Sequence, residues 1–231
     1  MGLTREDIIS GRIENMIIEA ERLGLSTRLS PEERRKSKEK ALARFAPDEE
    51  VWLFGYGSLM WNPCIHYVDH QRALVFGYHR SFCLQTLIGR GTPERCGLVL
   101  ALEPGGSCQG IAFRIAAELA DAELDIVWNR EMISGAYQPR VVKVQTPLGV
   151  RRAITFIMDR QHPRYLGGLN LQAAATMIAH AKGELGTCAE YLFNTVQHLD
   201  ELGIVDGPMH RLKCLVQELL AELPPGNPPP H

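Results

Sequence analysis

Three patterns of hydrophobic and polar residues follow one another along this chain, and each predicts a different kind of element. In the first part, apolar residues recur at helical spacing, and Thr4 with Asp7 suggests a capping box. Ser30 followed by Pro31 marks a second helix start, because serine can cap and proline is tolerated at the first helical position. We therefore expect residues 1–47 to form a helical extension. The apolar stripe of its first helix, which would end near Gly24, is Ile9, Ile13, Met16, Ile17 and Ala20.

The second pattern, from about residue 50 to 160, consists of the short apolar runs that are typical of β-strands. The sequences Glu103-Pro104-Gly105-Gly106 and Pro147-Leu148-Gly149 are turn signals, and each predicts a hairpin. One helix, over about 117–131, interrupts the series. Tandem hairpins favour an antiparallel sheet, and this number of strands can close into a barrel. The predicted strands are 51–55, 72–78, 81–87, 97–102, 109–115, 138–146 and 150–158.

The third pattern, from residue 170 onward, is helical again. The expected helix starts are Asn170, Thr187 with the capping-box residue Glu190, and Pro208. The first of these helices would reach Gly183 and the second would end at Gly203. The fold class is therefore α+β, with residues 48–223 as the main domain. Residues 224–231 contain five prolines and are expected to be disordered.

Composition narrows the range of partners. Lys and Arg total 25 against 27 Asp and Glu, so no basic field suggests a nucleic-acid partner. No apolar run approaches the roughly 20 residues needed to cross a bilayer, so no membrane partner is expected. The six cysteines include no Cys-x-x-Cys pair, which favours reduced thiols in a cytoplasmic protein. The charged run 32–36 is expected to be a solvated helix face, and the oligomeric state stays open.

The run from Val51 to Met60 contains the first candidate site. A short apolar strand ends at Gly55 and Gly57, which bracket Tyr56, and Ser58 follows. Such a turn can bring N–H groups close to a small anion. It lacks the Lys-Ser or Lys-Thr pair of a phosphate loop, the third glycine of a dinucleotide-binding turn, and the glycine spacing of a hydrolase nucleophile elbow. A plain tight turn at a strand end is the alternative.

The predicted helix over 117–131 contains the second candidate. Leu124, Val127, Trp128 and Glu131 fall at positions i, i+3, i+4 and i+7 and therefore share one face. A carboxylate on this apolar face, close to the negative end of the helix dipole, is expected to have a raised pKa. That property suits a proton shuttle. The alternative is a frayed helix end whose Glu131 side chain points to water. His66 and His70 also stand four apart, but nearby Pro63 argues against a helix and makes a metal site a weak candidate.

The segment Phe54-Gly55-Tyr56-Gly57-Ser58-Leu59-Met60-Trp61 resembles the signature of the γ-glutamylcyclotransferase superfamily. The wider pattern resembles its ChaC-type, glutathione-specific branch over about residues 50–220. The segments that carry this wider resemblance are Gly77–Phe82, Arg90–Pro93, Gly110–Arg114, Trp128–Met132 with Gly135–Tyr137, Tyr165–Gly167 and Asp206–Pro208.

The resemblance implies a fold and a site. The fold is a small antiparallel or mixed β-barrel with flanking helices, and the catalytic glutamate corresponds to Glu131. The glycine turn, Gly55 to Met60, would bind a γ-glutamyl group. Arg80 is a candidate partner for a substrate carboxylate, the alternative being an ion pair at the barrel rim; Tyr137 and Tyr165 either offer hydroxyls to the pocket or cap the core. The backbone N–H groups that would hold the substrate's α-carboxylate are those of Tyr56, Gly57, Ser58 and Leu59.

The implied reaction is intramolecular and needs no metal or other cofactor. The α-amine of the substrate attacks its own γ-carbonyl, and glutathione would give 5-oxoproline and cysteinylglycine. Two alternatives stay open. One is activity on other γ-glutamyl peptides or amines, and the other is a non-catalytic module that binds γ-glutamyl compounds or docks a partner through the N-terminal helices.

Overall fold

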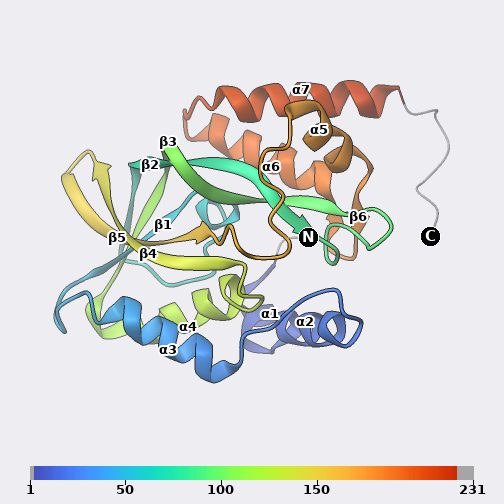
Figure 1. Ribbon diagram of the computed structural model, residues 1–231. Coiled ribbons are helices and arrows are strands. Elements are labelled where there is room, and N and C mark those ends of the chain that lie inside the picture. Colours follow the sequence, from blue (N-terminus) through green and yellow to red (C-terminus); the bar gives the residue numbers. More distant parts are fainter. Residues whose placement is uncertain (1–2, 223–231) are drawn as a thin grey trace. The chain divides into compact units, whose positions relative to one another are not determined.

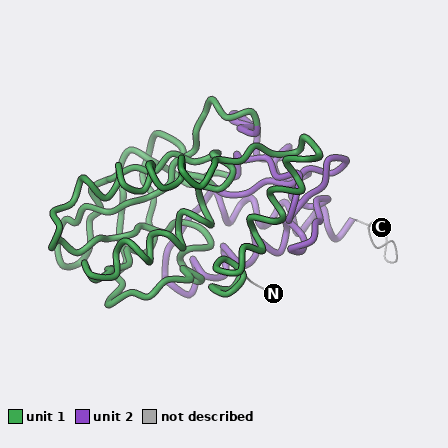
Figure 2. The backbone as a smooth tube through the Cα atoms, turned by 90° about the horizontal axis from the view of Figure 1, so that it is seen from below, with its two compact units in different colours: residues 1–81, 101–163 green, residues 82–100, 164–231 purple. Residues whose placement is uncertain are grey.

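The computed structural model describes residues 3–222, which form two compact units. Unit 1 comprises the chain up to residue 81 together with 101–163, and unit 2 comprises 82–100 and the chain from 164 onward (Figure 2). The glycine turn and Glu131 both belong to unit 1. The proline-rich tail that is predicted over 224–231 lies outside the described residues.

A closed barrel of five strands, in the order β1-β3-β2-β4-β5, is the centre of the fold (Figure 1). Strand β1 pairs antiparallel with β3 and parallel with β5, so the sheet is mixed. The hairpin expected at residues 147–149 is confirmed, since β4 and β5 pair antiparallel on either side of it. The strand bounds are β1 Val51–Gly55, β2 Asp69–Thr86, β3 Gly97–Ile115, β4 Tyr137–Thr146 and β5 Gly149–Met158.

Two breaks that were predicted between strands are absent from the described structure. The prediction of a hairpin at residues 103–106 is wrong, because β3 runs continuously through this segment. Likewise β2 continues where separate strands over 72–78 and 81–87 were expected. Gly105 and Gly106 have φ of +105° and +70°, and Gly77 has φ of +84°. Glycine adopts these left-handed values readily, so each site is accommodated within a strand instead of ending it.

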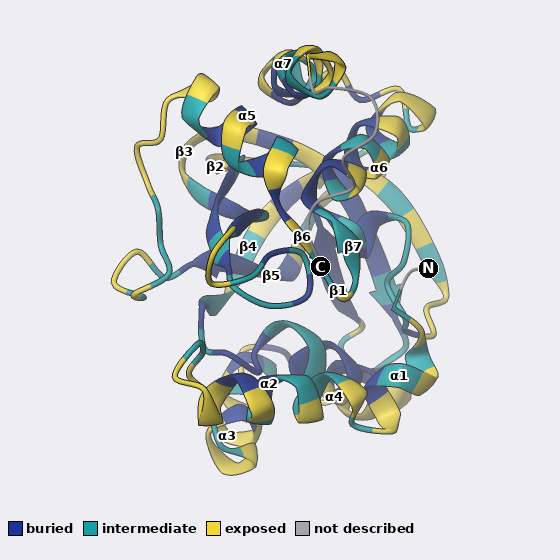
Figure 3. Cartoon of the chain, turned by 90° about the vertical axis from the view of Figure 1, so that its right-hand side faces the viewer, coloured by how far each residue is buried: buried dark blue, intermediate teal, exposed yellow. Residues whose placement is uncertain are grey.

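The barrel strands supply about half of the buried side chains of unit 1, whereas the helices α2 (Arg12–Arg22) and α3 (Pro31–Leu42) each present an exposed face (Figure 3). All five residues of β1 are buried. Its Thr155 neighbour on β5 donates a hydrogen bond from its hydroxyl to the Phe54 carbonyl at 3.0 Å, which satisfies a polar group inside the core. Strand β1 is therefore held rigidly up to the glycine turn that follows it.

Helix α4 (Ala120–Glu131), preceded by a short 3-10 turn η2 (Ala117–Leu119), packs against the barrel. The predicted apolar face is confirmed, since Leu124, Val127 and Trp128 are each at most 1% exposed. The Trp128 ring meets Phe156 of β5 edge-on, with 5.1 Å between the ring centroids. This contact fixes the rotation of the helix, and with it the direction of the residues at its C-terminal end.

The N-terminal extension differs from the expected pair of helices. Thr4 with Asp7 and Ser30 with Glu33 form the expected capping boxes. However, the single helix expected up to Gly24 is broken into α1 (Arg5–Ile9) and α2, because Gly11 has a left-handed φ of 77°. The break changes the apolar face: Ile8 is buried, whereas Ile9, which was expected on the stripe, is 63% exposed.

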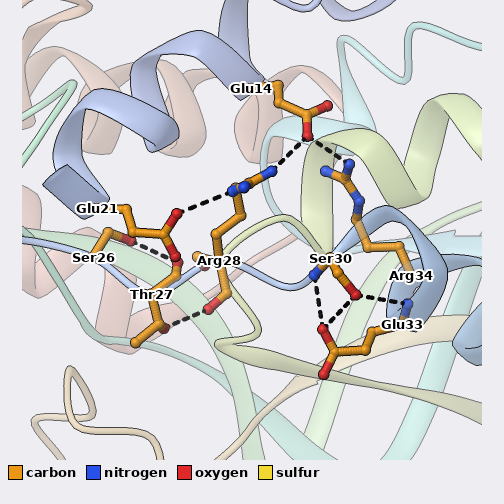
Figure 4. A network of polar contacts seen from close by, with 9 residues as sticks. Glu14, Glu21, Ser26, Thr27, Arg28, Ser30, Glu33 and Arg34 are labelled. Carbon is orange, nitrogen blue, oxygen red and sulfur yellow. Dashed lines mark hydrogen bonds and ion pairs between the residues drawn. The ribbon is translucent and has the colours of Figure 1, made fainter.

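Ion pairs join α2, α3 and the segment between them (Figure 4). The Glu14 carboxylate accepts hydrogen bonds from Arg28 at 3.2 Å and from Arg34 at 2.8 Å. The expectation of a solvated face over residues 32–36 is therefore wrong for Arg34, which is buried. It holds for Arg35 and Lys36, whose ion pairs with Glu32 are exposed.

Unit 2 is mainly helical, as expected. Its helices are α5 (Leu171–His180), α6 (Cys188–Glu201) and α7 (Gly207–Ala221). The side chains of Asn170 and Thr187 cap α5 and α6, and Asp206 caps α7. Helix α5 ends before the expected Gly183, because the short strand β6 (Lys182–Gly183) pairs with β7 (Gly186–Thr187). No helix in the described part of the chain is long and apolar enough to span a membrane.

Candidate active site

The glycine turn is a tight bend between strand β1 and a 3-10 helix, η1 (Ser58–Met60). Backbone hydrogen bonds close it, from Met60 N–H to the Gly57 carbonyl at 2.8 Å and from Asn62 N–H to the Ser58 carbonyl at 3.0 Å. The side chains of Leu59 and Met60 are buried. The side chains of these two residues therefore anchor the bend.

Gly110 on β3 makes room for this bend, since a Cβ atom there would lie 2.2 Å from the carbonyl oxygen of Gly55. Gly110→Ala is expected to displace the turn and to lower both activity and stability, the latter by about 1–3 kcal/mol, as other overpacked sites do. Urea unfolding and turnover measured on the same preparation test this. The matched control is Gly77→Ala, where nothing lies within 4 Å of the added Cβ. It should lose stability through its left-handed φ and keep its turnover.

Two side chains tie the turn to the barrel. The Tyr56 hydroxyl donates to the Phe156 carbonyl at 2.8 Å, and the Tyr56 carbonyl accepts from Arg80 Nε at 2.9 Å. Arg80 is buried and also donates from Nη2 to the Gln109 carbonyl. The Tyr56 ring therefore points into the barrel wall. Arg80 supports the turn through its hydrogen bond to the Tyr56 carbonyl. Its contact with a substrate carboxylate stays a prediction.

A single guanidinium connects the glycine turn to Glu131. Arg130 Nε donates to Glu131 Oε1 at 3.0 Å, and Nη2 donates to the Ser58 hydroxyl at 2.7 Å. Nη1 donates to the Asn62 carbonyl at 2.6 Å. The Arg130 side chain is only 8% exposed. Thus the two candidate sites that the sequence placed on separate elements, Ser58 after β1 and Glu131 on α4, share one hydrogen-bond network.

Glu131 is the last residue of α4, and its side chain is 16% exposed. Burial raises the pKa of this carboxyl above the ordinary glutamate value, while the charge and hydrogen bond of Arg130 oppose the rise. The burial predicted from the apolar face is therefore confirmed, and the exposed, frayed helix end is excluded. A carboxylate with a raised pKa that shares a guanidinium with a hydroxyl of the glycine turn is suited to proton transfer.

A family model described as ChaC-like protein matches residues 51–219. The chain belongs to the ChaC-like family. It is 42% identical over 194 residues to the glutathione-specific gamma-glutamylcyclotransferase of Escherichia coli (strain K12), with 84% of each chain covered. It is 30% identical over 160 residues to glutathione-specific gamma-glutamylcyclotransferase 1 of Homo sapiens, with 67% of this chain and 72% of that relative covered.

A solved structure of a yeast gamma glutamyl cyclotransferase specific to glutathione shares the fold of this ChaC-like chain. The match has a TM-score of 0.68 at 21% identity and covers 73% of this chain and 96% of that one. It confirms the α+β class and the barrel with flanking helices. The N-terminal helices up to α3 lie outside the residues that the family model matches.

The remaining candidate residues of the ChaC-like site are not brought together in one unit. Tyr137 is the first residue of β4, is half-buried and pairs with Met158 of β5 in unit 1. Tyr165 belongs to unit 2, where it forms an isolated β-bridge with Leu84. Their roles toward a substrate stay predictions. Within residues 3–222, no group of three or more His, Cys, Asp or Glu side chains is arranged to hold a metal ion.

Arg130 was missed by the sequence argument. The helical spacing identifies residues on the apolar face of α4, whereas Arg130 lies one position before Glu131 and off that face. A usable signal was its place in the segment Trp128–Met132, which also carries the resemblance to the family. An arginine next to a candidate buried carboxylate is a natural counter-charge, because an unpaired buried carboxylate is costly.

Proposed function

We propose that this protein is a γ-glutamylcyclotransferase that acts on glutathione and releases 5-oxoproline and cysteinylglycine. The observation that carries the proposal is the shared guanidinium, which holds the Glu131 carboxylate and the Ser58 hydroxyl in one network. The names of the relatives from Escherichia coli and Homo sapiens support glutathione as the substrate. The six free thiols support a cytoplasmic location as part of the same proposal.

The reaction forms one bond and breaks one bond. The α-amino nitrogen of the γ-glutamyl group attacks the γ-carbonyl carbon, which closes a five-membered ring, and the amide nitrogen of the cysteinyl residue leaves. Because both reacting groups belong to the substrate, the advantage of an intramolecular over a bimolecular reaction, about 7 kcal/mol or more, is available once the substrate is held in the folded conformation that the attack needs. The turn from Gly55 to Met60 supports this role, because backbone N–H groups of such a bend suit the α-carboxylate.

Glu131 is the proposed proton shuttle. As a carboxylate it removes a proton from the substrate's α-ammonium group, and as the acid it returns that proton to the leaving nitrogen. The second proton that the attacking nitrogen loses on forming the lactam passes to solvent, and the released amine takes up one proton from solvent. Its raised pKa supports both steps, since a base whose pKa lies nearer neutrality is more easily protonated and deprotonated in turn. Neither step requires a protein nucleophile or a bound metal.

Ser58 is the proposed donor to the developing oxyanion. Its oxygen accepts a hydrogen bond from Arg130, which leaves the hydroxyl hydrogen to be donated elsewhere. A donor that is oriented before the reaction stabilises the tetrahedral intermediate without reorganisation. In this proposal Arg130 therefore orients both the donor and the base.

Purified protein incubated with glutathione is expected to release 5-oxoproline and cysteinylglycine in equal amounts without added metal or nucleotide. Chromatographic measurement of both products tests this. A parallel panel of γ-glutamyl amino acids and amines separates a glutathione-directed enzyme from a general γ-glutamylcyclotransferase. Binding of glutathione with no product above a protein-free control would contradict the proposal and would favour a non-catalytic binding module.

A further inference from the structure

The loop that follows the glycine turn is bound by the first described residues of the chain. Asn62 Nδ2 donates to the Leu3 carbonyl at 2.6 Å, and the Cys64 thiol donates to the same carbonyl at 3.4 Å. Arg5 Nη1 donates to the Cys64 carbonyl at 2.9 Å. Cys64 thus has contacts on both its side chain and its backbone with a segment about 60 positions earlier in the chain.

Arg5 also fixes this loop to helix α4. Its guanidinium forms two hydrogen bonds with the Glu123 carboxylate, at 2.6 and 2.9 Å, and the Glu123 side chain is only 4% exposed. The same carboxylate accepts the His66 N–H at 2.9 Å. Burial alone would raise the pKa of Glu123, but the hydrogen bonds from Arg5 and His66 outweigh it, and the pKa is lowered. The carboxylate is therefore kept in its charged form as an acceptor for both elements.

The same loop, residues 61–66, also binds the Arg130 side chain. The Asn62 carbonyl accepts from Arg130 Nη1 at 2.6 Å, and Cys64 Sγ lies 3.7 Å from the same nitrogen. Cys64 has a φ of 59°, the one left-handed value of a non-glycine residue among the residues described. A strained backbone of this kind persists only where the surrounding contacts impose it. The N-terminal segment supplies such contacts directly.

We propose that Leu3 to Arg5 form a positioning element of the active centre, which holds the loop 61–66 in the conformation that places Arg130 against Glu131 and Ser58. This inference rests on the proposed function for its catalytic consequence. The segment lies outside the residues matched by the family model, and it does not touch the reacting groups itself. It acts through Asn62 and Cys64 on Arg130, and through Arg130 on the base.

The test compares two cations of the extension that both pair with carboxylates of α4. Arg5 contacts the loop. Lys38 pairs with Asp121 and Asp125 at 2.8 and 2.7 Å and, among the described residues, forms no hydrogen bond or ion pair with the loop. Arg5→Met is expected to lower kcat by about 10- to 100-fold, which is the size of effect that a small misplacement of catalytic groups produces, with KM nearly unchanged. Lys38→Met should leave kcat unchanged at a temperature where both variants are folded.

Two further measurements separate positioning from a general loss of stability. In Arg5→Met the buried Glu123 carboxylate loses its ion pair with Arg5. The double variant Arg5→Met/Glu123→Gln removes the charge of that carboxylate, so it should regain thermal stability while kcat stays low. Hydrogen exchange of the amides between Ser58 and His66 should be faster in Arg5→Met than in Lys38→Met. Equal kcat for Arg5→Met and wild type, or equal exchange in the two single variants, would overturn the inference. An inactive wild-type protein would instead contradict the proposed function, and the exchange experiment would still decide whether the segment orders the loop.

Discussion

Glu131→Gln is expected to reduce kcat on glutathione by about 10²–10⁴-fold, the usual contribution of a positioned general acid and base. Glutamine keeps the size of the side chain and can still accept the hydrogen bond from Arg130 Nε, but it cannot take up a proton. KM should change little, because the proposed binding groups on the glycine turn are untouched. Steady-state kinetics of 5-oxoproline release, with circular dichroism to confirm the fold, measure the effect.

Asp125→Asn is the matched control for this substitution. It removes a carboxylate from the same helix, where Asp125 pairs with Lys38 and its side chain is 55% exposed. Its turnover should equal that of the wild type. If Glu131→Gln kept more than about a tenth of the wild-type kcat, Glu131 would not be the proton shuttle, since general acid–base catalysis contributes at least about 100-fold.

Arg130→Met is expected to have the second largest effect, a loss of roughly 10²-fold in kcat together with a changed pH profile, because misplacing catalytic groups by about 1 Å costs that much. Glu131 must be ionised to act as a base, so the rate rises with pH on the acid side. The charge and hydrogen bond of Arg130 lower the pKa of Glu131 against the effect of burial. Their removal therefore moves the acid limb of the kcat profile to higher pH.

Two variants serve as controls for Arg130. Arg130→Lys keeps the positive charge but cannot reach three acceptors at once, so it should retain the position of the acid limb better than it retains kcat. Arg114→Met removes an arginine of β3 that pairs with Glu50 at 2.5 Å, away from the turn, and both its kcat and its pH profile should match the wild type. An unchanged acid limb in Arg130→Met would contradict the assignment of that limb to Glu131.

Local signals made the helix starts and the position of Glu131 predictable. A cap such as Thr187 with Glu190 involves residues three apart, so the sequence contains both partners. The low exposure of the Glu131 side chain, 16%, followed from the helical spacing of Leu124 and Trp128, and it needed only a correct helix over that stretch. The turn after β1 was recognisable for the same reason, since its glycines and serine are adjacent.

The features that sequence analysis missed depend on distant partners. Gly105 and Gly106 look like a turn, but β3, which neighbours β2 in the barrel, continues through them. The burial of Arg34 depends on Glu14, 20 positions away, and the role of Arg130 depends on Ser58, 72 positions away. No periodicity within a helix reveals such pairs, because they are decided by which elements pack together.

The division of the chain between the two units limits how this protein can be cut or recombined. The chain passes from one unit to the other three times, after residues 81, 100 and 163. A fragment that ends at residue 163 would retain Ser58, Arg130 and Glu131, but its residues 82–100 would lose hydrogen bonds such as those of Gln85 with Arg164 and of Cys83 with Leu166. No single break in the gene yields either unit intact. Libraries that shuffle this enzyme with its relatives should therefore exchange the whole segment from β1 to α7, not one half of it.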